Sequence, residues 1–196
     1  MNAEEIYEYL ERIGNLLRTD VRRSGLASGL QPVQLEALHY LSRCNKYSNT
    51  PVTVAEFLGL TKGTVSQTLG VLEASQLIEK QPDARDRRVV HLVLTDLGER
   101  VVAESIPPQV LRSAIEGLPD GDANEVAAIL DGILRRLQQA KGMRTFGACK
   151  NCRHHQLQDD GSRRCGLTSE ALTDADAEKL CREHEPPEAA KASADG

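Results

Sequence analysis

The sequence predicts a mainly α-helical protein with one small β-hairpin and a separate, cysteine-rich C-terminal part. Apolar residues recur at helical spacing through most of residues 4–140, and only residues 77–94 alternate as strands do. Four of the five cysteines fall in the last quarter of the chain. The 196 residues, of which 40% are hydrophobic and 27% charged, suffice for one domain and a small appendage.

Composition excludes several classes of protein. No stretch approaches the roughly 20 apolar residues of a membrane helix, and the acidic start, residues 1–5, lacks the features of a signal peptide. We therefore expect a cytoplasmic protein with no membrane partner. With 3% aromatic residues and no Trp, base stacking is not its means of recognition. The net charge of -5 leaves room for a local basic surface.

Three helices are expected before residue 60. Residues 4–21 carry an apolar stripe with a charged opposite face, which is typical of an amphipathic helix. Pro32 suits the first turn of a second helix that ends near Asn45. Thr53 is the expected cap of a short third helix that stops at Gly59.

A fourth helix is expected to begin after Thr61, which is a good N-cap residue. Its apolar positions Val65, Leu69 and Leu72 repeat at four and three. The other face is small and polar. Two short helices separated by the three residues 59–61 match the helix-turn-helix pattern.

The next segments predict a β-hairpin with a long charged tip. Residues 77–80 and 89–94 read as strands, and the loop 81–88 between them carries Arg85, Arg87 and Arg88. A basic hairpin that directly follows a helix-turn-helix makes the fold a winged helix.

Long helices complete this part of the chain. Thr95 caps a fifth helix, which Pro107–Pro108 breaks before it resumes at residues 110–115. After a turn at residues 117–121, residues 126–137 define a sixth helix with a wide apolar stripe. Terminal helices with such stripes need a cover, and a second copy of the chain is the simplest one. We therefore expect a homodimer.

Particular residues extend this pattern to a known family. They are Val65-Ser66-Gln67 and Leu72-Glu73 in the fourth helix, Asp83-Ala84-Arg85-Asp86-Arg87-Arg88 in the wing, and Leu94-Thr95-Asp96-Leu97-Gly98 after it. With these motifs, residues 4–140 resemble the MarR family of bacterial transcription regulators. The resemblance implies a homodimer with interlocked terminal helices that binds a palindromic DNA operator. The family usually has Gly where this chain has Gln76, before the first wing strand.

The predicted DNA site consists of the fourth helix and the wing. Thr64, Ser66 and Gln67 are candidates for base contacts in the major groove, and a Gln can bind adenine through two hydrogen bonds. Lys62 is a candidate for a phosphate contact. In the wing, Arg85 is the candidate for the minor groove. Arg87 and Arg88 either contact phosphates or pair with Asp83 and Asp86.

The C-terminal part predicts a metal site. We divide the chain into residues 1–140, a linker 141–148, a cysteine module 149–185 and a disordered tail 186–196. The module has the spacing Cys149-x2-Cys152-x12-Cys165-x15-Cys181, which has only one close pair and favours an iron-sulfur cluster, with zinc as the alternative. Five nearby cations would offset the charge of four thiolates: Lys150, Arg153, Arg163, Arg164 and Arg182. We expect His154, His155 and His184 to be solvated, and Cys44 to be a packing residue.

The functional hypothesis is a dimeric regulator of transcription, a repressor, whose binding to a double-stranded DNA operator responds to redox state, oxygen or iron through the cluster. The alternative is a winged-helix module for protein or DNA with a purely structural zinc site. An enzyme is not expected, because no phosphate-binding loop and no paired nucleophile and base are evident. A small-molecule effector remains open.

Overall fold

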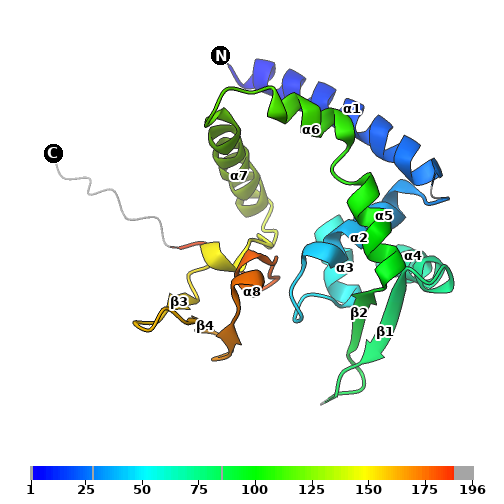
Figure 1. The fold of residues 1–196 in the computed structure, drawn as a ribbon, viewed down its shortest axis with the longest axis vertical. Coiled ribbons are helices and arrows are strands. Elements are labelled where there is room, and N and C mark those ends of the chain that lie inside the picture. The colour runs from blue at the N-terminus through cyan, green and yellow to red at the C-terminus, as the bar shows by residue number, and fades with distance from the viewer. Residues whose placement is uncertain (1, 28, 85, 188–196) are drawn as a thin grey trace.

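The computed structural model describes residues 2–27, 29–84 and 86–187. The first part has the helices and strands α1 (Ala3–Ala27), α2 (Pro32–Arg43), α3 (Pro51–Leu58), α4 (Lys62–Ala74), β1 (Ile78–Pro82), β2 (Val90–Leu94), α5 (Asp96–Ser105), α6 (Gln109–Glu116) and α7 (Asp122–Ala140). The cysteine module follows with η1 (Cys149–Asn151), β3 (His155–Leu157), β4 (Arg163–Cys165), β5 (Ala171–Leu172) and α8 (Asp174–Glu178). The predicted winged-helix fold, mainly helical with a small antiparallel hairpin, is confirmed for the first part (Figure 1). The cysteine module adds an antiparallel sheet, β3–β4–β5, that was not predicted.

The helix-turn-helix surrounds a closed apolar core. Leu38 of α2, Val54 of α3 and Leu72 of α4 are completely buried. Gly59 takes a left-handed conformation, with φ of 65°, and ends α3 as predicted. The start of α3 is a correction: Thr50, not Thr53, is its N-cap. Pro51 needs no hydrogen-bond acceptor and fits the first helical position, so the helix begins three residues earlier than expected.

The end of α4 forms without the usual glycine. Gln76 has φ of 58°, the left-handed conformation that normally favours Gly. Its N–H donates to Glu73 O at 2.9 Å, and the Leu77 N–H donates to Leu72 O at 2.9 Å. These two bonds make a Schellman motif. The turn into the wing is therefore kept, at the cost of a side chain in an unfavourable backbone region.

The base of the wing packs tightly on the start of α5. Strands β1 and β2 pair antiparallel, with Ile78 opposite Leu94. Thr95 caps α5 as predicted, because its side chain accepts a hydrogen bond from the Gly98 N–H. A Cβ atom at Gly98 would lie 2.2 Å from the carbonyl oxygen of Leu77. Only glycine allows this close approach of helix and strand.

We expect Gly98→Ala to lower the free energy of unfolding by about 1–3 kcal/mol, because the added methyl group must push the Leu77 backbone away. Urea unfolding measures this. Gly70→Ala in α4 is the control: its Cβ meets no atom within 4 Å, so stability should stay equal or rise. A Gly98→Ala protein as stable as the parent would show that this contact is loose.

Three helices expose apolar side chains. Neither α6 nor α7 contains a buried residue, and α1 is exposed along most of its length. The exposed apolar residues are Ile6, Leu10 and Ile13 on α1, Val110 and Ile115 on α6, and Val126, Ile129, Leu130, Leu134 and Leu137 on α7. Among the described residues, no helix has the length and apolarity needed to cross a membrane.

The cysteine module lies against the winged helix (Figure 1). Phe146, within the predicted linker 141–148, is buried in the winged-helix core. Its ring lies 6.1 Å from that of Tyr40 and 5.2 Å from that of Phe57, centroid to centroid. The segment between α7 and the module is thus fixed to the fold by aromatic packing.

Candidate DNA interface and cysteine centre

The exposed face of α4 carries the predicted base-contacting residues. Its buried side consists of Val65, Thr68, Leu69 and Leu72. Lys62, Thr64, Ser66 and Gln67 are all exposed. Thr64 is partly engaged, since its hydroxyl lies 2.9 Å from that of Thr61, the N-cap. Gln67 is thus left as the long polar side chain on this face, beyond the first turn of the helix.

In the wing, the acidic residues hold the backbone of the turn. The Asp86 N–H donates to Asp83 Oδ1 at 2.8 Å, and the Arg88 N–H donates to Asp86 Oδ1 at 3.0 Å. Both Arg87 and Arg88 are exposed, and neither forms an ion pair within the described part of the chain. Arg85 lies outside the described residues.

A residue that sequence analysis missed holds the wing to the helix-turn-helix. His91 of β2 places Nδ1 at 2.6 Å from Asn49 Oδ1 and Nε2 at 3.1 Å from Asp83 Oδ2. Asn49 precedes α3, and its carbonyl accepts the Leu92 N–H at 2.7 Å. This histidine therefore links the loop before α3, the strand and the wing tip.

All four cysteines of the module open onto one cavity of about 270 Å³, the cysteine cavity. Cys149 and Cys152 flank η1, Cys165 ends β4, and Cys181 follows α8. The wall is completed by residues of the module and by two residues of the α2–α3 turn. These two are Asn45 and Tyr47. The cysteine cavity therefore borders the turn that leads into α3, the first helix of the helix-turn-helix.

Each of the four sulfurs accepts at least one hydrogen bond from nitrogen. The Glu185 N–H donates to Cys152 Sγ at 3.5 Å. For Cys165 the donors are the backbone N–H groups of Leu167 and Thr168, and for Cys181 they are the Glu183 N–H and the Asn45 side chain. His155 Nδ1 lies 3.6 Å from Cys149 Sγ. Such donors stabilise thiolates, the form that binds metals.

The orientation of His155 follows from its other neighbour. Arg163 Nη1 lies 3.3 Å from His155 Nε2, and a guanidinium can only donate, so Nε2 accepts. Burial, followed by the charge of Arg163, holds the pKa of His155 below its usual value and keeps the ring neutral. Its proton is then on Nδ1, facing Cys149. The histidine thus directs its N–H toward the Cys149 sulfur.

Burial raises the pKa of Cys181 above its usual value, and among the cavity cysteines Cys165 has a lowered pKa. For Cys165 burial acts upward, but the hydrogen bonds from Thr168 and Leu167 bring its pKa below the usual value. Burial, and then the charges of the other three cavity cysteines, raise the pKa of Cys149 to about 11. Burial raises the pKa of Cys44 to about 12, and its thiol donates to Leu41 O. Cys44 is therefore a neutral packing residue, as predicted.

None of the three histidines predicted to be solvated is fully exposed: His154 and His155 are half-buried, and His155 contacts Cys149 and Arg163. His184 is buried, at 4% exposure, so the prediction that it is solvated is wrong. Its Nε2 lies 3.1 Å from Asn151 O and its Nδ1 lies 2.7 Å from Thr145 Oγ1, which leaves no free ring nitrogen for a metal. A Cβ atom at Gly147 would lie 2.5 Å from this ring. His184 therefore joins residues 145–151 to the end of the module.

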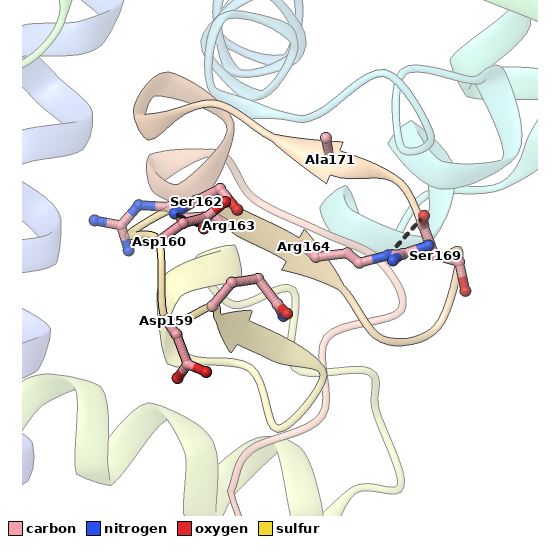
Figure 2. Close-up of a pocket in the computed structure, with 8 residues that line it drawn as sticks. Asp159, Asp160, Ser162, Arg163, Arg164, Ser169 and Ala171 are labelled. Atoms are coloured by element: carbon pink, nitrogen blue, oxygen red, sulfur yellow. Dashed lines mark hydrogen bonds between the residues drawn. The ribbon is translucent and has the colours of Figure 1, made fainter.

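The five cations near the cysteines are engaged by other groups. Four form ion pairs at 2.6–2.7 Å: Lys150 with Glu178, Arg153 with Glu185, Arg163 with Asp174 and Arg182 with Glu56. Figure 2 shows the fifth, Arg164, reaching the Ser169 carbonyl across a shallow polar hollow on the β3–β4–β5 sheet. Carboxylates therefore already balance the positive charge of four of these five side chains.

Comparison with known proteins supports the winged-helix part of this description. Residues 28–89 match the sequence model of the MarR family, which spans the segment from before α2 to the end of the wing loop. This part of the chain has a MarR-like winged-helix fold. The cysteine module lies outside the matched segment.

The chain is also similar to named MarR-type relatives. It is 32% identical to the uncharacterized regulator YwaE of Bacillus subtilis over 43% of this chain and 48% of that protein. Identity to the transcriptional repressor MprA of Escherichia coli K12 is 28%, over 58% of this chain and 65% of MprA. The chain thus spans about half to two thirds of the length of these relatives.

A solved structure also shows similarity to this winged-helix part of the chain. The Staphylococcus aureus MepR–DNA complex aligns with a TM-score of 0.53 and 26% identity, covering 67% of this chain and 98% of MepR. The matched relatives are described as transcriptional regulators or repressors, in agreement with the expectation that this MarR-like chain is not an enzyme.

Proposed function

We propose that the protein is a DNA-binding transcription repressor that binds a palindromic operator as a homodimer and whose operator affinity depends on an iron-sulfur cluster. One observation carries the sensing role: four hydrogen-bonded cysteine sulfurs face a cavity whose wall includes Asn45 and Tyr47 of the turn that leads from α2 into α3. The DNA-binding role is supported by the exposed polar face of α4, the exposed arginines of the wing and the similarity to MepR, which was solved bound to DNA.

The proposed dimer uses the exposed apolar faces of α1, α6 and α7. In the dimer, the two copies of α4 must reach half-sites about 34 Å apart on B-DNA. Helices α1, α6 and α7 would therefore set the distance between the two copies of α4, and with it the fit to the operator. Apolar patches of this extent are uncommon on a monomer.

An iron-sulfur cluster suits the cysteine cavity better than one zinc ion. The cysteine cavity has a volume of about 270 Å³, many times that of one water molecule, roughly 30 Å³. In the described residues no three His, Cys, Asp or Glu side chains are arranged to hold a metal ion. A structural zinc needs four ligand atoms about 2.0–2.3 Å from one centre. Cys149, Cys152, Cys165 and Cys181 would hold the cluster, which when bound supplies a redox-active and oxygen-sensitive group.

Anaerobic purification tests this proposal. We expect a brown protein containing iron and sulfide, and a gel shift on a duplex selected by the protein from a random pool should differ between the anaerobic and the air-exposed preparations. A colourless protein containing zinc would overturn the cluster. Equal affinities before and after exposure to air would overturn the sensing role.

We expect Gln67→Ala to reduce the preference for one base pair in each half-site, with a loss of about 1–3 kcal/mol on the selected duplex, because the amide can pair with adenine. Gel shifts on duplexes that vary one base pair at a time measure this. Gln109→Ala, an exposed glutamine at the start of α6, is the control. An unchanged base preference for Gln67→Ala would place Gln67 away from the bases.

A further inference from the structure

The segment that carries Cys181 is hydrogen-bonded to the end of α2 and the turn that follows it. The Leu180 N–H donates to Arg43 O at 2.8 Å, and the Asn45 N–H donates to Leu180 O at 2.9 Å. On its other side, the Cys181 N–H donates to Gly147 O at 3.0 Å. Residues 179–182, the docking segment, therefore run between the end of α2 and the start of the module, and Leu180 is buried there.

Arg182 extends the docking segment to helix α3. Its Nε lies 2.6 Å from Glu56 Oε2 and its Nη2 lies 2.7 Å from Glu56 Oε1, a two-pronged contact. Its backbone N–H donates at 2.9 Å to the hydroxyl of Ser48, which is completely buried. Hydrogen bonds from Arg182 hold the pKa of Glu56 below its usual value. The contact therefore fixes both the guanidinium and the backbone of Arg182.

Glu56 belongs to the first helix of the helix-turn-helix. Helix α3 packs directly on α4, which carries Gln67, and both helices contribute to the same buried core. Cys181 and Arg182 are neighbours in sequence, so one peptide unit joins a sulfur of the cysteine cavity to the side chain that grips α3. A shift of Cys181 must move Arg182 or strain its contacts.

We infer that Arg182 is the positioning residue through which the cysteine centre acts on the DNA-binding helices. With Cys181 held by the metal centre, the docking segment stays in place and Arg182 fixes α3 against the module. Loss of the centre frees Cys181, loosens the docking segment and releases α3. This inference rests on the proposed function.

The test compares Arg182→Ala with Arg153→Ala. Arg153 also follows a cavity cysteine, Cys152, but its ion pair, with Glu185 at 2.7 Å, stays within the module. Each variant and the parent are prepared with and without the cluster, and affinity for the selected duplex is measured at fixed salt. For the parent and Arg153→Ala we expect the two forms to differ about 10- to 100-fold, a common size for allosteric coupling. For Arg182→Ala the difference should fall below roughly threefold while the cluster absorbance remains.

Hydrogen exchange gives a second readout that needs no DNA. In the parent, removal of the cluster should speed exchange of the amides of residues 52–58, whereas in Arg182→Ala exchange should be fast in both forms. Glu56→Gln removes the same ion pair with little change in volume, so it replaces Arg182→Ala if that variant does not fold. It should behave as Arg182→Ala does.

The outcomes separate the two proposals. If the parent responds to cluster loss and Arg182→Ala responds to the same extent, the inference is wrong and the sensing function stands. If the parent has no cluster, or binds DNA equally with and without it, the sensing function fails and there is nothing for Arg182 to transmit.

Discussion

Replacement of Cys165 by serine is expected to abolish the visible absorbance of the anaerobic protein and to change operator affinity about 10-fold or more. Cys165 accepts hydrogen bonds from Leu167 and Thr168, which hold its pKa below the usual value and make it a good thiolate ligand. A serine hydroxyl at this site stays protonated and is a poor ligand for iron or zinc. The winged-helix core does not include Cys165, so the variant should remain folded.

Cys44→Ala is the control for this experiment. Cys44 is buried, donates to a carbonyl and lies outside the set of sulfurs that line the cysteine cavity. This variant should keep the cluster and its effect on DNA binding, with some loss of stability. Iron and sulfide analysis, circular dichroism and gel shifts distinguish the two proteins. Retention of a full cluster in Cys165→Ser would remove Cys165 from the ligand set.

The winged helix could be predicted from sequence because its signals are local. Thr61 and Thr95 cap their helices within one turn, and the spacing of Val65, Leu69 and Leu72 alone defines the buried side of α4. Apolar periodicity placed helix ends less well, since α1 and α7 both extend beyond the predicted 4–21 and 126–137. The start of α3 was misplaced because Thr53 is also a good cap residue. Pro51 at the first helical position decides the start in favour of Thr50.

The connection between module and winged helix could not be predicted, since its contacts are distant in sequence. Glu56 and Arg182 are 126 residues apart, and no periodicity relates them. Sequence analysis found Arg182 only as one of five cations near cysteines. It placed Phe146 in a linker, although its ring packs with Tyr40 and Phe57. The sequence alone predicted that the four cysteines form one site. The hydrogen-bond donors to their sulfurs could be identified only in the folded structure.

Leu130→Glu is expected to make the protein monomeric and to weaken binding to the full operator about 100-fold or more. Leu130 lies on α7, is 45% exposed in the single chain and belongs to the apolar face for which we propose a second copy as cover. Burying a carboxylate in such an interface without a partner is strongly unfavourable. Joining two binding units raises overall affinity by about 10²–10⁴, and this gain is lost with the dimer.

Sedimentation measures the oligomeric state, and gel shifts on one half-site and on the full operator measure the loss of the second contact. Leu157→Glu is the matched control, because Leu157 is an exposed leucine of strand β3 in the cysteine module. It should leave the dimer and both affinities unchanged. Leu130→Glu should bind a single half-site as the parent lobe does, since the exposed face of α4 is intact. A Leu130→Glu protein that sediments as a dimer would show that α7 is covered by something other than a second copy.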